Sequence, residues 1–182
     1  DYIVWRDRCL GHGLTAPTWP KVYGGAGLDP DAYSAWEQAL VDAQVPPPVV
    51  GFGLTMIGPT LLHSGTEEQK QRHLPAIVRG DIRWCQGYSE PGAGSDLASL
   101  STQAVRDGDS LVVTGQKVWT SYAHLSDWIF VLVRTSRGER KQQGITFLLM
   151  DLSSPGVDIR PIELISGNSP FCEVFFDQVR VP

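Results

Sequence analysis

The first 82 residues of the sequence carry hydrophobic side chains at the spacing expected of helices. Asp29 is placed to cap a helix that begins at Pro30 and ends before the proline run 46–48. Apolar positions recur three and four residues apart along it, at Tyr33, Trp36, Leu40 and Ala43. Such a helix presents one apolar stripe to the rest of its domain.

A second helical segment follows between residues 66 and 80. Thr66 and Gln69 fit a capping box, and the two acidic residues between them suit the positive end of a helix dipole. Gly80 is placed to end the segment. Because proline lacks the N–H group that a helix interior needs, we expect Pro75 to split this segment into two short helices.

From residue 83 onward the hydrophobic positions alternate as they do in strands. Asp107-Gly108 separates two alternating runs, which predicts a hairpin. Three further runs rich in valine, isoleucine and phenylalanine are "DWIFVLVRTS", "GITFLLMDLS" and "EVFFDQVRVP". No segment between them is long enough for a crossover helix. We therefore predict a multi-domain α and β protein, with an all-α domain over residues 1–82 and an antiparallel, barrel-like β domain over residues 83–182.

Composition narrows the classes of function. Apolar residues make up 42% of the 182 residues and the formal charge is −5, which argues against a general nucleic-acid binder. The basic run "RGERK" at 137–141 is expected to be a solvated loop. Cys9, Cys85 and Cys172 form no CxxC pair, so we expect free thiols, a reducing cytoplasmic location and no metal site. The most apolar stretch is too short and too broken to span a membrane.

The stretch "GYSEPGAGSD", residues 87–96, is the first candidate for chemistry. It is not a hydrolase nucleophile elbow, because Pro91 stands where the second glycine is required. Nor is it a dinucleotide-binding loop, because Leu97 replaces the third glycine and no βαβ unit surrounds it. Gly92 and Gly94 permit a positive φ and close approach of a ligand to the backbone. A plain glycine-rich connecting loop fits these residues equally well.

A second cluster, "GQKVWTSYAHLSDW" at residues 115–128, favours a binding function. A lone tryptophan in a strand is usually a core residue. Trp119, however, is followed directly by the hydroxyl residues Thr120 and Ser121. A large aromatic side chain beside two hydroxyls is what a flat heteroaromatic cofactor needs, since one stacks and the others donate hydrogen bonds to its edge.

Taken together, the sequence resembles the acyl-CoA dehydrogenase family. The matching stretches are "WPKVYGGAGL", "GTEEQKQRHLPAIVRGD", "SEPGAGSD", "GQKVWTS" and "EVFFDQVRVP", in family order and over nearly the whole chain. The resemblance implies a helical N-terminal domain whose start is truncated here, a β middle domain that is incomplete here, and a C-terminal helical bundle that is missing from residues 1–182. It also implies FAD as cofactor. The stretch "WCQGYSEPGAGSDLASL" further resembles members that act on bulky or dicarboxylic acyl-CoAs, including sterol side chains.

Carried over by position, the resemblance implies a set of residues that line the flavin. They are Gln86, Gly87, Tyr88, Ser89, Gly94, Ser95, Trp119, Thr120 and Ser121. Ser89 would donate to the pyrimidine edge of the isoalloxazine and Ser121 to its N5. Ser95 would reach the pyrophosphate and border the channel of the acyl-CoA substrate.

The implied reaction is α,β-dehydrogenation of an acyl-CoA thioester, with hydride transfer to flavin N5. The family's catalytic base is a glutamate in its C-terminal part, so no catalytic residue is expected in this chain, which alone is expected to be inactive. Glu90 belongs to the structural loop. The resemblance further implies an electron-transfer flavoprotein or similar acceptor and a homo- or hetero-oligomer. An acyl-CoA oxidase, a flavin monooxygenase, a subunit of a heteromeric dehydrogenase without a complete site, and a binding module without cofactor remain open.

Overall fold

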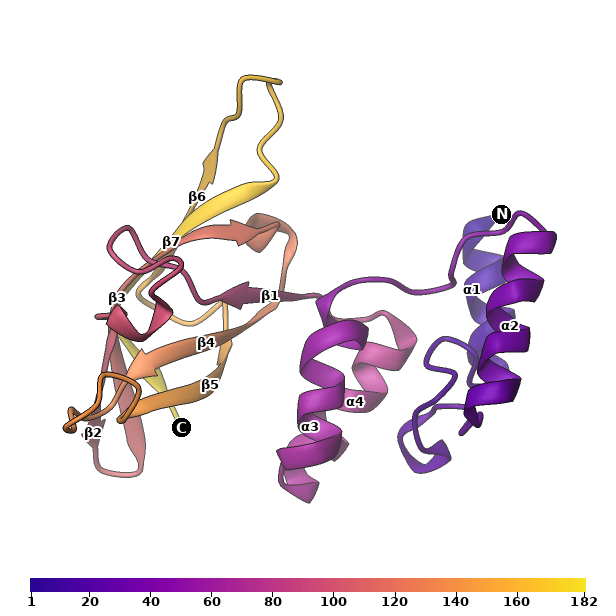
Figure 1. Ribbon diagram of the computed structural model, residues 1–182, viewed down its shortest axis with the longest axis horizontal. Coiled ribbons are helices and arrows are strands. Elements are labelled where there is room, and N and C mark those ends of the chain that lie inside the picture. Colours follow the sequence, from indigo (N-terminus) through magenta and orange to yellow (C-terminus); the bar gives the residue numbers. More distant parts are fainter. The chain divides into compact units, whose positions relative to one another are not determined.

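The computed structural model describes residues 1–182 and divides the chain into two compact units, Asp1–Arg83 and Trp84–Pro182. The first unit is helical and the second is built on one sheet (Figure 1). No helix combines the length and the apolar character needed to cross a bilayer.

The helical unit contains four α-helices. They are α1 (Tyr2–Gly11), α2 (Pro30–Asp42), α3 (Gly58–Ser64), which follows a π-helical turn at Gly53–Ile57, and α4 (Glu67–Arg79). Local signals set the ends of α2 and α4 as the sequence predicted. The Asp29 side chain accepts a hydrogen bond from the N–H of Ala32 at 2.8 Å, and Thr66 and Gln69 form both bonds of a capping box. Gly80 ends α4 in the left-handed conformation at φ +71°.

The expectation that Pro75 splits the last helical segment is wrong, because α4 runs unbroken through it. A proline in a helix interior removes one hydrogen bond and costs about 3 kcal/mol. Leu74, Ile77 and Val78, which flank it, are at most 2% exposed. Burying side chains of this size contributes about 1.5–3 kcal/mol each, which offsets the loss.

The apolar stripe of α2 is present but is not part of a packed core, since no residue of this helix is buried. Trp36 stacks on Trp5 of α1 with the ring centroids 6.1 Å apart. The indole N–H of Trp5 in turn donates to the carbonyl oxygen of Pro46 at 2.9 Å. Helices α1 and α2 therefore meet through aromatic side chains at the start of the proline run.

The second unit is a seven-stranded sheet. Its strands are β1 (Trp84–Gly87), β2 (Gln103–Asp107), β3 (Ser110–Ser121), β4 (Trp128–Arg134), β5 (Ile145–Asp151), β6 (Val157–Ile162) and β7 (Phe171–Val181). They lie in the order β1-β4-β2-β3-β7-β6, and β5 also pairs with β4. The predicted hairpin is confirmed as β2–β3, with its turn at Gly108 and Asp109. The sheet curls into the half-barrel expected of the middle domain.

The sheet is mixed rather than purely antiparallel, which corrects one detail of the prediction. β1 pairs with β4 in parallel from Trp84↔Trp128 to Gly87↔Val131, and β2 meets β4 in parallel at Gln103↔Arg134. A parallel pair needs a crossover connection, and no crossover helix exists here. The β2–β3 hairpin takes that place, because it lies between β1 and β4 in the chain.

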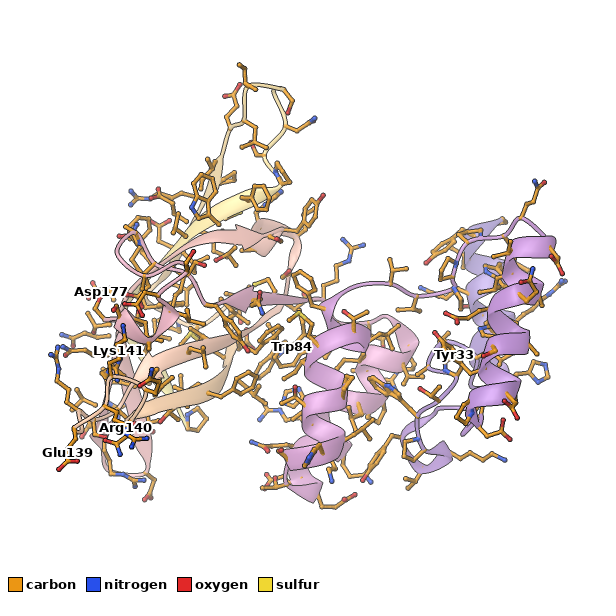
Figure 2. All side chains as sticks on the ribbon, viewed as in Figure 1. Tyr33, Trp84, Glu139, Arg140, Lys141 and Asp177 are labelled. Atoms are coloured by element: carbon orange, nitrogen blue, oxygen red, sulfur yellow. The ribbon has the colours of Figure 1, made fainter.

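The core of the sheet unit is formed by the inward-facing side chains of its strands. Its members include Cys85, Ala104, Val113, Ile129, Val131, Val133, Met150, Cys172, Val174 and Phe176. All three cysteines of the chain are free, as expected, and all three are buried. The run at 137–141 is an exposed loop between β4 and β5, also as expected, and Figure 2 shows the side chains of Glu139, Arg140 and Lys141 at that end of the unit.

Candidate functional site

The two sequence motifs that favoured a binding function lie against each other in the sheet unit. The first begins at the end of β1 and continues into the loop after it, and the second forms the last part of β3. The N–H of Val118 donates to the carbonyl oxygen of Ser89 at 2.9 Å. This bond fixes the Ser89 segment beside the strand that carries Trp119 and Ser121.

A buried ion pair reinforces this contact. The Nζ atom of Lys117 lies 2.7 Å from Oε1 of Glu90, and the exposed fractions of the two residues are 0% and 6%. The same Nζ donates to the carbonyl oxygen of Tyr88 at 3.2 Å. Ser101 donates its N–H and its hydroxyl to Glu90 Oε2, at 2.7 and 2.8 Å, and the N–H of Thr102 donates to Oε1 at 2.9 Å.

These contacts decide the protonation state of Glu90. Burial by itself raises the pKa of this carboxyl group, but the hydrogen bonds from Lys117, Thr102 and Ser101 outweigh burial and lower the pKa to about 2. For Lys117, burial lowers the pKa and the Glu90 carboxylate acts in the opposite direction. A carboxylate that accepts four hydrogen bonds and is shielded from solvent is an anchor for the loop, not a group poised to remove a proton.

The tip of the loop is tight and open to solvent. Glu90 and Ala93 exchange both backbone hydrogen bonds, at 2.9 and 3.0 Å, across Pro91 and Gly92. Neither Gly92 nor Gly94 adopts the positive φ that the sequence permitted. A Cβ added at either position would meet no atom within 4 Å. These glycines therefore contribute open space beside the backbone, and Ser95 next to them is exposed.

The end of β3 is held in an uncommon backbone conformation. Trp119 has φ +60° and Tyr122 has φ +52°, in the left-handed region that non-glycine residues rarely enter. The pairing of β3 with β7 shifts register between Lys117 and Thr120. Trp119 is 56% exposed and contacts the edge of Phe171 with the ring centroids 6.0 Å apart. It is thus a surface aromatic residue, not part of the core, and strain of this kind concentrates at functional sites.

The remaining predicted residues occupy different environments. Gln86 and Tyr88 are half-buried, and the Tyr88 ring meets Phe130 edge-on with the centroids 5.9 Å apart. Gly87 is buried, and a Cβ there would lie 2.7 Å from Cδ1 of Ile129. Gly87 therefore lets β1 pack closely on the sheet.

Thr120 is separated from its two neighbours in the motif. It is 1% exposed, and its buried hydroxyl has no hydrogen-bond partner, whereas Trp119 is exposed and Ser121 is half-buried. Simple alternation along β3 would place Thr120 on the face opposite the buried Lys117, but the register shift between these two residues and the left-handed backbone of Trp119 turn the Thr120 side chain into the core. The structure thus brings Ser89, Trp119 and Ser121 to one region and turns Thr120 into the core.

Sequence reasoning missed Lys117. The available signal was a lysine at an inward-facing position of an alternating strand, where an apolar residue belongs. A lysine in such a place requires a buried partner, and Glu90 was the acidic residue already present in the other motif.

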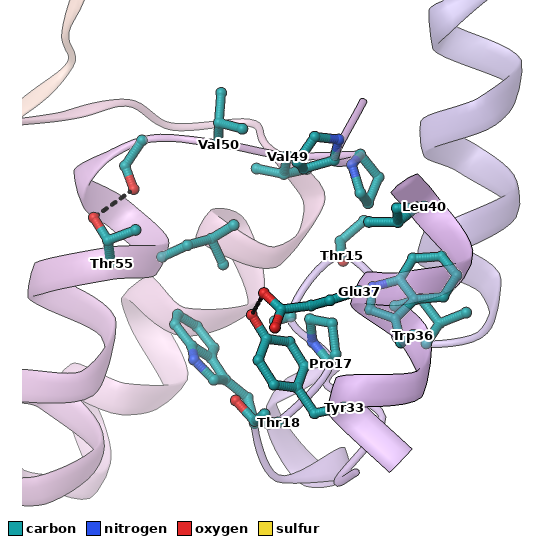
Figure 3. Close-up of a pocket in the computed structure, with 17 residues that line it drawn as sticks. Thr15, Pro17, Thr18, Tyr33, Trp36, Glu37, Leu40, Val49, Val50 and Thr55 are labelled. Carbon is teal, nitrogen blue, oxygen red and sulfur yellow. Dashed lines mark hydrogen bonds between the residues drawn. The ribbon is translucent and has the colours of Figure 1, made fainter. Parts of the chain in front are cut away.

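The helical unit has a cavity of its own, about 300 Å³ in volume, between α2 and residues 47–55 (Figure 3). Its walls are mainly aromatic, proline and aliphatic side chains. The Tyr33 hydroxyl donates to the Glu37 carboxylate at 2.7 Å on one side, and the Thr15 hydroxyl, also lining the cavity, is buried without a partner. None of the residues predicted to bind a cofactor lines this cavity.

Comparison with known families matches both units. The model described as "Acyl-CoA dehydrogenase, N-terminal domain" covers residues 4–81, and the one described as "Acyl-CoA dehydrogenase, middle domain" covers residues 85–179. The helical and sheet units thus correspond to these two domains in family order.

Individual relatives support the same family. The chain is 50% identical over 177 residues to acyl-CoA dehydrogenase IpdE1 of Mycobacterium tuberculosis (strain ATCC 25618 / H37Rv), a match that covers 97% of this chain and 46% of that protein. Among solved structures, the "Tcur3481-Tcur3483 steroid ACAD" has a TM-score of 0.83 at 37% identity. The ChsE4-ChsE5 complex from Mycobacterium tuberculosis has a TM-score of 0.81 at 38% identity. Each structural match covers 100% of this chain and 46% of the other.

The chain therefore spans about half the length of the relatives it matches. Within that half, the match includes the helical unit, the curled mixed sheet and both motifs whose meeting forms the candidate site. The chain belongs to the acyl-CoA dehydrogenase family.

Proposed function

We propose that the chain forms the flavin-binding part of an FAD-dependent acyl-CoA dehydrogenase, which introduces a double bond between the α and β carbons of an acyl-CoA thioester. The observation that carries the proposal is the meeting of the Ser89 segment with the end of β3. There, polar groups without hydrogen-bond partners in the chain lie on the two segments that meet beside the exposed aromatic residue Trp119.

The residues present fit an isoalloxazine ring, which is flat, aromatic and polar along its edge. The N–H of Ser89 and the hydroxyls of Ser89 and Ser121 make no hydrogen bond within the chain, so they are available to such an edge. The exposed ring of Trp119 offers an apolar wall. Gly94 and Ser95, which are open to solvent, suit the pyrophosphate and the neighbouring acyl-CoA channel.

When bound, FAD would supply the acceptor for the β hydrogen as hydride, and a carboxylate would be needed to take the α proton. The residues of this chain would hold the flavin and polarise its ring. Ser121 would donate a hydrogen bond where charge accumulates, and the Ser89 N–H would donate one at the pyrimidine edge. Glu90 is excluded as the base because it is buried and fully hydrogen-bonded. We propose, from the resemblance to the family, that the base lies outside residues 1–182.

A heteromeric assembly is the second candidate. The structures matched include a ChsE4-ChsE5 complex and a Tcur3481-Tcur3483 steroid acyl-CoA dehydrogenase, both named for two components. By this likeness we propose that a second subunit completes the protein, that the acyl-CoA carries a bulky steroid-like group, and that an electron-transfer flavoprotein accepts the electrons. Rapid oxygen uptake on substrate addition would instead indicate an oxidase.

The first test is to purify the protein with its native flanking sequence and any copurifying subunit, and to record its visible spectrum. A flavin spectrum that bleaches anaerobically with acyl-CoA is expected. A protein that stays colourless and takes up no added FAD would refute the proposal.

The second test is Ser121→Ala, for which we expect flavin reduction by substrate to slow by about 100- to 1,000-fold, as when one donor to a developing charge is lost. Ser153→Ala is the matched control. Its hydroxyl bonds Asp151 beyond the end of β5, so flavin reduction should be unchanged. Equal rates in wild type and Ser121→Ala would contradict the role given to Ser121.

A further inference from the structure

The buried ammonium of Lys117 has two acceptors, and only one is a carboxylate. Besides Oε1 of Glu90, its Nζ atom contacts the carbonyl oxygen of Tyr88 at 3.2 Å. That carbonyl and the N–H of Ser89 belong to the same peptide group. The N–H at the other end of this peptide has no acceptor within the chain.

A cation that binds a peptide oxygen withdraws electron density from the whole amide. The N–H of that peptide then becomes a stronger hydrogen-bond donor, which is the cooperative strengthening seen in chains of hydrogen bonds. Screening by water does not weaken the effect here, because Lys117 is 0% exposed. Without such a lysine, a cofactor at Ser89 would meet an ordinary amide.

We propose that Lys117 is a positioning residue that strengthens the Ser89 amide as a donor and thereby raises the reduction potential of a flavin bound to it. The inference rests on the proposed function and extends it to a residue that does not touch the cofactor. A reduced flavin carries more negative charge than an oxidised one, so a stronger donor favours the reduced form.

Glu90 has a complementary part. A lone ammonium in this position would be costly to bury, and the carboxylate keeps it charged. The three N–H and O–H groups of Ser101 and Thr102 hold the carboxylate in place. The direction of Lys117 toward the Tyr88 oxygen is thereby fixed.

A purely structural ion pair predicts a different outcome from an electrostatic one. If Lys117 only clamps the loop, its loss weakens FAD binding equally in both redox states, and the potential stays constant. If Lys117 polarises the peptide, its loss weakens binding of reduced flavin more than that of oxidised flavin.

The test uses the FAD-loaded protein with its native flanking sequence, titrated against a redox dye. In Lys117→Met we expect the equilibrium between oxidised and two-electron-reduced flavin to move toward the oxidised form by about tenfold, which is about 30 mV. Lys141→Met is the matched control, since Lys141 is an exposed cation paired with Asp96 in the same unit. The reduction potential of the flavin in this variant should equal that in wild type.

If Lys117→Met does not fold, the double variant Glu90→Gln with Lys117→Met removes both buried charges and keeps similar shapes. It too should show the lowered potential. An unchanged potential in whichever of these variants folds overturns the proposal.

A second measurement does not depend on flavin. In the flavin-free protein labelled with ¹⁵N-serine, the amide proton of Ser89 should resonate further upfield in Lys117→Met, because its N–H is less polarised. An unmoved resonance overturns the inference. If no variant or wild type binds FAD, the proposed function fails, while this resonance still decides whether Lys117 polarises the peptide.

Discussion

Replacement of Glu90 by alanine is the sharpest test of how the candidate site is held together. The change leaves the Lys117 ammonium buried with only the Tyr88 carbonyl oxygen, and it strips Ser101 and Thr102 of their acceptor. Removing one partner of a buried pair typically costs about 3–5 kcal/mol.

Two features of the structure support that magnitude. The lowering of the Glu90 pKa from 4.5 to about 2 corresponds to about 3 kcal/mol of stabilisation of the ionised group. An upper limit comes from Lys117, which can lose its proton instead of staying charged. From its usual pKa of 10.5, that loss costs about 5 kcal/mol at neutral pH. We therefore expect Glu90→Ala to lower the free energy of unfolding by about 3–5 kcal/mol.

The assay is denaturant unfolding followed by circular dichroism, with Asp96→Ala as control. Asp96 is also paired with a lysine, at 2.6 Å, but both side chains are 55% exposed, so its loss should cost much less than the loss of Glu90. Adding Lys117→Met to Glu90→Ala should recover part of the loss, since no unpaired charge is then buried. A cost for Glu90→Ala no larger than that for Asp96→Ala would refute the reasoning.

Three further outcomes follow from the packing. Burial lowers the pKa of His73 to about 4, so the unfolded state takes up a proton at a higher pH than the folded state does. The free energy of unfolding should therefore fall as the pH drops from about 6.5 to 4. Denaturant midpoints should show a smaller fall in a His73→Phe variant. Thr15→Val removes a buried hydroxyl without a partner and should leave the unfolding free energy unchanged or raise it by up to about 1 kcal/mol. Gly87→Ala should destabilise the folded protein by about 1–3 kcal/mol, because the added Cβ would press on Ile129. Gly94→Ala should not destabilise it, because open space surrounds Gly94. Equal thermal midpoints for the two variants would contradict this reasoning.

What could be predicted from the sequence was mostly local. Caps such as Asp29 and Thr66 act over three residues, so their pattern is visible along the chain. Pro75 was misread because its cost is local, whereas the compensating burial is tertiary. The parallel pairing of β1 with β4 and the partner of Lys117 depend on which distant segments meet, which no local pattern records.

In the candidate site, too, the local motifs could be predicted from the sequence and the tertiary arrangement could not. Ser89 and Ser121 are predicted from short motifs, and the structure adds that the Ser89 segment lies against β3, the strand that carries Ser121. Thr120 was included with its neighbours because adjacent letters cannot show which face of a strand each side chain occupies. The register shift before it and the positive φ of Trp119 decide that question, and neither is visible in the sequence.

The parallel pairing of β1 with β4 also has a consequence for the order in which the sheet unit folds. The β2–β3 hairpin can form from neighbouring residues, but β1 cannot join β4 until the chain between them has been placed. Contacts of this kind close long loops and form slowly. Since the segment that carries Ser89 leaves β1 directly, its meeting with β3 is completed late in folding. Newly made chains would therefore complete the proposed flavin site only after most of their secondary structure is in place.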